Sequence, residues 1–130
     1  MSIHEACYSG NVGAVAAMLR AGTSPNLPAD PGQNWVSCAG PAPRPLNCVA
    51  IAWTLTEQHL DVARLLIEYG AIVDKTVVRD HEIEMCLTPI DRAFRELLRA
   101  ATRFANPDLY RHITEGDALL DALPSQVKHR

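Results

Sequence analysis

The sequence predicts an all-α protein, and its composition and apolar patterning are the observations behind this prediction. Aromatic residues make up only 5% of the chain, while alanine and leucine supply most of an apolar fraction of 48%. Small side chains, and side chains unbranched at the β carbon, favour close-packed helices over a β-sandwich. Apolar residues also recur three and four positions apart in several segments, which is the spacing of one helix face.

Three segments within the first 71 residues show this helical pattern. They span residues 3–12, 14–22 and 59–71, and in the last of them the apolar side chains share one face. Two of the segments close on Gly22 and Gly70. Glycine favours the left-handed backbone just past a helix C-terminus, so we expect helices that alternate with turns.

The pattern changes toward the C-terminus. Residues 90–101 form one long amphipathic segment. We expect this helix to end near Asn106 and Pro107, because proline cannot continue a helix. A last helix is predicted for residues 108–123, with a break near Gly116.

Several motifs within these segments resemble the ankyrin-repeat family. IHEAC at residues 3–7 and TPIDRA at residues 88–93 resemble the family's TPLHxA helix start, and AGTSPN at residues 21–26 resembles its GADxN ending. Residues 59–74 match the family's second helix and its exit almost throughout. The resemblance implies an all-α solenoid of helix–turn–helix units with long finger loops, closed here by a helical C-terminal cap.

The spacing departs from the family period of about 33 residues. Gly22 and Gly70 are 48 residues apart, an excess of about 15 over that period. We assign about ten of these residues to the loop at 26–44, and about five to the first helix of the second repeat, which starts at Pro45. The predicted domain spans residues 1–123, with repeats at 2–26, 44–74 and 88–123, and a flexible tail at 124–130.

Charge and hydropathy exclude several classes of protein. The net charge of −3 gives no global basic field for nucleic acid, and no apolar stretch reaches the roughly 18 residues of a membrane span. The N-terminus lacks the basic and apolar regions of a secretory signal, so we expect a cytoplasmic protein. Ser2 and Glu5 fit the S-x-x-E capping box of a helix start. The first repeat then begins at its helix without a preceding finger, from which we expect a complete gene product.

The four cysteines, Cys7, Cys38, Cys48 and Cys86, include no closely spaced pair, so we predict no zinc site and no other cofactor. Without a signal peptide, reduced thiols are favoured over two disulfides. His4 and Cys7 lie one helical turn apart, as a thiol and its base would. We favour a structural role, because in the family pattern the histidine braces the turn and Cys7 takes an inward alanine position. Nothing supplies a third orienting group or an oxyanion hole, and we predict no catalytic residue.

The loop at residues 26–44 is rich in proline and glycine and carries Trp35 in a polar context. Prolines lower the entropy cost of an ordered loop, and long ordered loops are usually functional. Tryptophan is enriched at binding hot spots, but Trp35 could instead fold back as a lid over the small core, and both interpretations stay open. Trp53 lies in the helical pattern with Ala50, so we predict that it belongs to the core.

Residues 75–87 are predicted to form a β-hairpin finger, because residues 82–85 alternate between charged and apolar. The carboxylates at positions 80, 82 and 84 give its tip an acidic character. Ankyrin proteins bind partners through such fingers and the adjoining concave helix face, so the resemblance implies contacts there. The predicted partner-binding residues are Tyr8, Ser9, Trp35, Thr56, Glu57, Asp80, Glu82, Glu84, Met85 and Leu87.

Four arginines, Arg92, Arg95, Arg99 and Arg103, are spaced three or four apart on one helix face, opposite its apolar stripe. Such a stripe can bind an acidic partner or a phosphate backbone. Charge on a helix face more often serves only solvation, and Glu96 offsets part of it.

We therefore predict a non-catalytic protein–protein interaction module that binds a protein partner through its finger loops and concave helix face, as an inhibitor or an adaptor. The alternative is a regulator that binds an anionic ligand or nucleic acid through the arginine stripe. A thiol-dependent hydrolase is the weakest hypothesis. No cofactor, metal ion or membrane is expected to take part.

Overall fold

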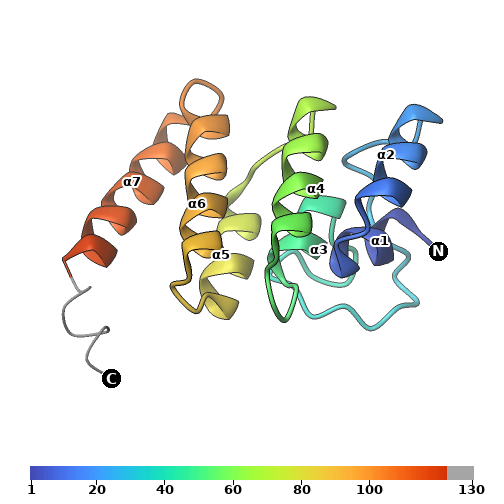
Figure 1. The fold of residues 1–130 in the computed structure, drawn as a ribbon, viewed down its shortest axis with the longest axis horizontal. Helices are drawn as coiled ribbons and strands as arrows, with labels where there is room; N and C mark the ends of the chain where they lie inside the picture. Colours follow the sequence, from blue (N-terminus) through green and yellow to red (C-terminus); the bar gives the residue numbers. More distant parts are fainter. Residues whose placement is uncertain (123–130) are drawn as a thin grey trace.

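The computed structural model describes residues 1–122, and seven helices form the regular structure of this part of the chain (Figure 1). The described residues contain no strand, which confirms the all-α prediction. The predicted tail at 124–130, and Leu123 of the last predicted helix, lie outside the described residues. The helices are α1 (Ile3–Ser9), α2 (Val12–Arg20), α3 (Pro45–Ala50), α4 (Glu57–Glu68), α5 (Lys75–Glu84), α6 (Pro89–Thr102) and α7 (Pro107–Asp121).

The helices form two rows that run along the long axis of the molecule (Figure 1). In one row α1 contacts α3 and α3 contacts α5, and in the other α2 contacts α4 and α4 contacts α6. Contacts of α1 with α2 and of α3 with α4 join the two rows. The last helix, α7, packs against α6 at the end far from α1. None of the helices in the described part is long and apolar enough to cross a lipid bilayer.

The hydrophobic core lies between the two rows. Ala6, Val49, Leu66 and Phe94, from four different helices, are among its fully buried side chains. Burying one leucine or phenylalanine side chain contributes roughly 1.5–3 kcal/mol. The predicted long amphipathic helix is confirmed as α6, and its apolar face packs on this core.

Local sequence sets the start and end of α1. The Ser2 hydroxyl accepts a hydrogen bond from the Glu5 backbone N–H at 3.1 Å, and the Ser2 backbone N–H donates to Glu5 Oε1 at 3.2 Å, which is the predicted capping box. Gly10 follows the helix with φ +75°, and a β carbon at this position would lie 3.0 Å from the His59 ring. Glycine therefore permits both the left-handed turn and the close approach of α4.

The predicted β-hairpin finger at residues 75–87 is wrong, because residues 75–84 form helix α5. Asp74 caps this helix by accepting hydrogen bonds from the backbone N–H groups of Thr76 at 3.0 Å and Val77 at 3.2 Å. The side chains that α5 buries follow helical spacing, and they outweigh the short alternation at residues 82–85. These buried residues are Val77, Val78, Asp80 and His81.

The third predicted repeat, at residues 88–123, does not include α5. In the structure α5 takes the position after α3 in its row, and α6 takes the position after α4. The TPIDRA motif, which resembles the start of a first helix, therefore begins a helix of the second row.

Three further predictions are corrected, two in the loop after α3 and one in α7. Helix α3 ends at Ala50 after six residues, so the extra residues that were predicted to lengthen this helix lie in the loop at 51–56. Trp53 lies in this loop and is 82% exposed, so the prediction that it belongs to the core is wrong. Helix α7 continues through Gly116 without the predicted break.

Candidate functional site

The long loop between α2 and α3 is fastened to α5 by the carboxylate of Asp80. This residue is 2% exposed and accepts hydrogen bonds from Ser37 Oγ at 2.7 Å, the Cys38 backbone N–H at 2.6 Å and Asn47 Nδ2 at 3.0 Å. All three donors are neutral groups. Asp80, predicted at the tip of an acidic finger, is therefore a buried anchor of the loop.

Trp35 holds the middle of the same loop against α1. Its ring packs edge-on against the Tyr8 ring, with 5.6 Å between the ring centroids, and its Nε1 donates to Gln33 Oε1 at 2.8 Å. The side chain is half-buried and packs on the core. Trp35 thus covers part of the core with one portion of its surface and leaves the rest open to solvent.

The start of the loop is fixed by His4. Its Nε2 lies 2.6 Å from the carbonyl oxygen of Leu27, 23 residues further along the chain. This contact differs from the local turn brace that the family pattern implies. Together with the anchor at Asp80, this contact fixes the loop that runs from α2 to α3 (Figure 1). All six residues of α3 are buried.

The predicted contact residues at the helix ends form one group. The carbonyl oxygen of Tyr8 lies 2.8 Å from His59 Nε2, which brings the end of α1 to the start of α4. Thr56 caps α4 through its hydroxyl, which accepts from the His59 backbone N–H at 3.4 Å. Ser9 and Glu57 are exposed beside them, and Trp35 joins the group through Tyr8.

The remaining predicted contacts lie on the last turn of α5 and in the loop that follows it. Glu84 is exposed, whereas Met85 and Leu87 are half-buried, and Leu87 adopts a left-handed backbone with φ +59°. Glu82 is engaged by Arg95, whose Nη1 lies 3.2 Å from its Oε2. Of the three predicted tip carboxylates, Glu84 is thus the one on the open surface.

Three large apolar side chains are exposed on the side of the molecule where these loops lie. Val36 of the long loop is 88% exposed, Trp53 of the α3–α4 loop 82%, and Ile83 of α5 71%. Val36 and Ile83 are not among the contact residues that were predicted from the sequence. The signal for Val36 in the sequence was its position next to Trp35 in the long loop. We call Val36, Trp53 and Ile83 the exposed apolar surface.

Two hollows connect these three residues. The first, which we call the Val36 hollow, has a volume of about 200 Å³ and includes Val36, Ile51 and Ile83 in its lining. The second, the Trp53 hollow, has a volume of about 140 Å³ and includes Trp53 and Thr88. Glu84 lines both, so the two hollows are neighbours on one surface.

A buried histidine–aspartate pair lies beside the Trp53 hollow. His81 Nε2 is 2.9 Å from Asp91 Oδ1, and Asp91 also accepts from the Cys86 backbone N–H at 3.0 Å and the Thr88 hydroxyl at 2.9 Å. Burial lowers the pKa of His81, although the bond to Asp91 opposes this shift. Burial alone would raise the pKa of Asp91, but its hydrogen bonds outweigh burial and lower it. Asp91 is therefore ionised and His81 neutral near pH 7, and His81 Nδ1 has no hydrogen-bond partner among the described residues.

We expect this pair to make the stability of the protein sensitive to acid. The unfolded chain binds a proton at a histidine below about pH 6.5, whereas folded His81 resists it, so stability is full above that pH and declines below it. The lowered pKa of Asp91 adds a second loss of stability below about pH 4, where the unfolded chain binds a proton at this residue more readily than the folded protein does. The thermal midpoint should fall between about pH 7.5 and pH 5.5, and His81→Gln should reduce that fall. The exposed His112→Gln serves as the control, and an equal effect of both variants would contradict the assignment to His81.

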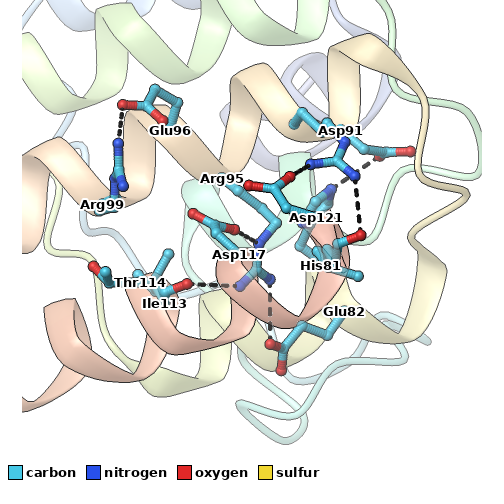
Figure 2. A network of polar contacts seen from close by, with 12 residues as sticks. His81, Glu82, Asp91, Arg95, Glu96, Arg99, Ile113, Thr114, Asp117 and Asp121 are labelled. Atoms are coloured by element: carbon cyan, nitrogen blue, oxygen red, sulfur yellow. Dashed lines mark hydrogen bonds and ion pairs between the residues drawn. The ribbon is translucent and has the colours of Figure 1, made fainter. Parts of the chain in front are cut away.

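The predicted arginine stripe is not an open surface. Arg95 is 2% exposed. Figure 2 shows that its guanidinium is held by Asp117, Glu82 and the carbonyl oxygen of Ile113, with Nε 2.5 Å from Asp117 Oδ1. The prediction of an exposed Arg95 is wrong because α7 covers this face of α6. The other three arginines are engaged as well: Arg92 pairs with Asp121, Arg99 pairs with Glu96, and Arg103 lies over the Phe104 ring.

The possible thiol chemistry at α1 lacks an activated nucleophile. Cys7 is completely buried, and burial strongly raises the pKa of its thiol. His4, one turn away, is occupied by the carbonyl oxygen of Leu27. The described residues also contain no group of three side chains arranged to hold a metal ion.

A cleft of about 490 Å³ lies between the starts of α5 and α7. It is lined by Lys75, Arg79 and His112, but also by Asp74 and Asp108. Because its lining combines acidic and basic side chains, this cleft does not single out anions or cations. The exposed apolar surface is the more selective feature. Comparison of the chain with protein-family models, with curated proteins and with solved structures finds no match, so a function has to be argued from these residues.

Proposed function

We propose that this protein is a non-catalytic interaction module that binds a protein partner on the exposed apolar surface. The observation that carries the proposal is the exposure of Val36, Trp53 and Ile83, at 71–88%, from three separate segments around two adjoining hollows. Large apolar side chains gathered on one surface mark interaction sites in water-exposed proteins. Tryptophan is also among the residues that most often dominate binding energy.

The arrangement of the helices supports an ankyrin-type solenoid as the scaffold. Two rows of helices, in which each helix contacts the next one of its row, are expected for stacked helix–turn–helix units. In this proposal α7 caps the array, and the long loop lies where a finger would project. The loop is fixed at His4, Trp35 and Asp80. A rigid surface lowers the entropy cost of binding.

The alternative functions have less support. An anionic ligand would need free arginines, whereas Arg95 is buried and Arg92 and Arg99 are paired with carboxylates. A thiol hydrolase would need an activated thiol, whereas Cys7 is buried.

Truncation of Trp53 should strongly weaken partner binding without unfolding the protein. Because Trp53 is exposed, Trp53→Ala should leave the thermal midpoint nearly unchanged. It should weaken the partner affinity by at least about 2 kcal/mol, roughly 30-fold in Kd. The measurement is affinity purification from the native source, followed by titration of the purified partner.

A matched control is available in Phe104, which is 87% exposed in the loop at the far end of α6. Phe104→Ala removes an equally exposed aromatic ring and should retain the partner. If Phe104→Ala loses the partner while Trp53→Ala keeps it, the binding surface lies elsewhere.

A further inference from the structure

Two buried carboxylates lie beneath the exposed apolar surface. Asp80 contributes to the lining of the Val36 hollow and Asp91 to that of the Trp53 hollow. Each is at most 5% exposed. Asp80 accepts three hydrogen bonds from neutral donors, and Asp91 accepts from backbone, hydroxyl and neutral imidazole groups. Their charges are therefore stabilised by dipoles, without a cation bound directly to either carboxylate in the described part of the chain.

Glu84 adds a third negative charge at the surface itself. It is exposed and lines both hollows. A third hollow adjoins the Val36 hollow and is lined by Arg79 and Glu82 among others. Arg79 is the only cation among the described residues that line the three hollows. The negative potential at the centre of the surface is thus only partly offset. The apolar side chains around the hollows have a low dielectric constant, so a charged group that approaches this surface experiences a stronger electric field than it would in open water.

The Trp53 hollow combines this potential with an aromatic face. Trp53 and Glu84 both line it, and the Trp53 ring is largely exposed. An indole face attracts a guanidinium or ammonium group, by about 0.5–2 kcal/mol depending on desolvation. The volume of about 140 Å³ is close to that of an engineered cavity of about 150 Å³ that holds a benzene molecule. One planar guanidinium or one lysine side chain therefore suits its size.

The neighbouring Val36 hollow suits a different side chain. Val36, Ile51 and Ile83 supply branched apolar groups around a volume of about 200 Å³. Burial of a leucine- or phenylalanine-sized side chain there contributes roughly 1.5–3 kcal/mol. Because Glu84 borders both hollows, the two side chains would belong to one short segment of the partner.

On the basis of the proposed function, we infer that the partner presents a segment with a basic side chain next to a large apolar one. The arginine or lysine enters the Trp53 hollow between Trp53 and Glu84, and the apolar side chain enters the Val36 hollow. The apolar contacts supply most of the affinity, and the carboxylates select the cation.

A peptide library tests this inference without knowledge of the partner. The immobilised protein is used to select from random linear peptides displayed on phage. The enriched peptides should combine arginine or lysine with a neighbouring large apolar residue. The best synthetic peptide should bind about tenfold more weakly to Glu84→Lys and should lose its affinity for Trp53→Ala.

Glu68→Lys is the matched control, because Glu68 is an exposed carboxylate at the far end of α4 and its replacement makes the same change in net charge. This variant should retain the affinity for the peptide within about twofold. If peptides are enriched and depend on Trp53 but carry no basic residue, or bind Glu84→Lys and Glu68→Lys alike, the inference is wrong and the proposed function survives. If no peptide enriched on the protein depends on Trp53 or Ile83, the proposed function fails as well.

Discussion

Replacement of Arg95 with alanine is expected to lower the free energy of unfolding by about 3–5 kcal/mol. The guanidinium is 2% exposed and joins Glu82 of α5 and Asp117 of α7 to α6. Without it, two carboxylates that are at most one third exposed lose their cation, and the carbonyl oxygen of Ile113 loses a donor. The loss is measured by urea unfolding, and amide hydrogen exchange should show that α7 is the first helix to open.

Arg99→Ala is the matched control. Arg99 lies one turn further along α6 and pairs with the exposed Glu96, so its removal should cost no more than about 1 kcal/mol. Equal losses for the two variants would show that Arg95 does not hold α7 in place.

Gly116 provides a second test of the same contact. A β carbon at Gly116 would lie 2.7 Å from Arg95 Nη2, so Gly116→Ala should destabilise the protein, although alanine is favoured over glycine in a helix by about 1 kcal/mol. In the Arg95→Ala background the obstacle is gone, and Gly116→Ala should become stabilising. This reversal of sign in a double-mutant cycle would assign the cost to the Arg95 contact.

The helices that could be predicted from sequence are those fixed by local signals. The capping box at Ser2, the left-handed Gly70 just past the end of α4 and the apolar face of α6 all depend on residues within about two turns of one another. Helix α5 could not be recognised because polar residues occupy part of its buried face. Asp80 and His81 are buried there, and the partners that make burial of Asp80 possible are 33–43 residues away in the chain.

The prediction of an open arginine stripe was wrong for a related reason. Periodicity separates one face of α6 from the other, but it does not show what covers the second face. Arg95 was assigned to solvent because it lies opposite the apolar stripe, and in the structure α7 packs on α6 and encloses it. The predicted helix break at Gly116 was wrong because the sequence does not show that α7 packs on α6. The absence of a side chain at Gly116 leaves room for the Arg95 guanidinium.

Two of the three segments that form the exposed apolar surface were predicted to carry contacts, whereas the third, which carries Trp53, was predicted to belong to the core. The long loop at 26–44 and the segment at 75–87, most of which is helix α5, both contribute to the exposed apolar surface. Which of two adjacent apolar residues turns outward depends on the anchors of the loop. Trp35 turns toward Tyr8 while Val36 remains 88% exposed, and the sequence shows only that the two are neighbours.

Replacement of Asp80 with alanine should both destabilise the protein and release the long loop. The substitution leaves the Ser37 hydroxyl, the Cys38 backbone N–H and the Asn47 amide without their acceptor. Hydrogen bonds to a charged group contribute about 1.5–3 kcal/mol each, and relief of the buried charge returns part of this, so we expect a net loss of roughly 2–4 kcal/mol. Asp80→Asn should recover little, because its amide nitrogen would face donors where an oxygen is required.

Glu84→Gln is the control for this experiment, since Glu84 lies one turn away on α5 and is exposed. It should change the free energy of unfolding by less than about 0.5 kcal/mol. Amide exchange at Cys38 should accelerate in Asp80→Ala and stay unchanged in Glu84→Gln, because Asp80 alone accepts that hydrogen bond. A stable Asp80→Ala variant with slow exchange at Cys38 would mean that contacts such as Trp35 with Tyr8 suffice to hold the loop. In that case Val36 would keep its place on the exposed apolar surface independently of α5.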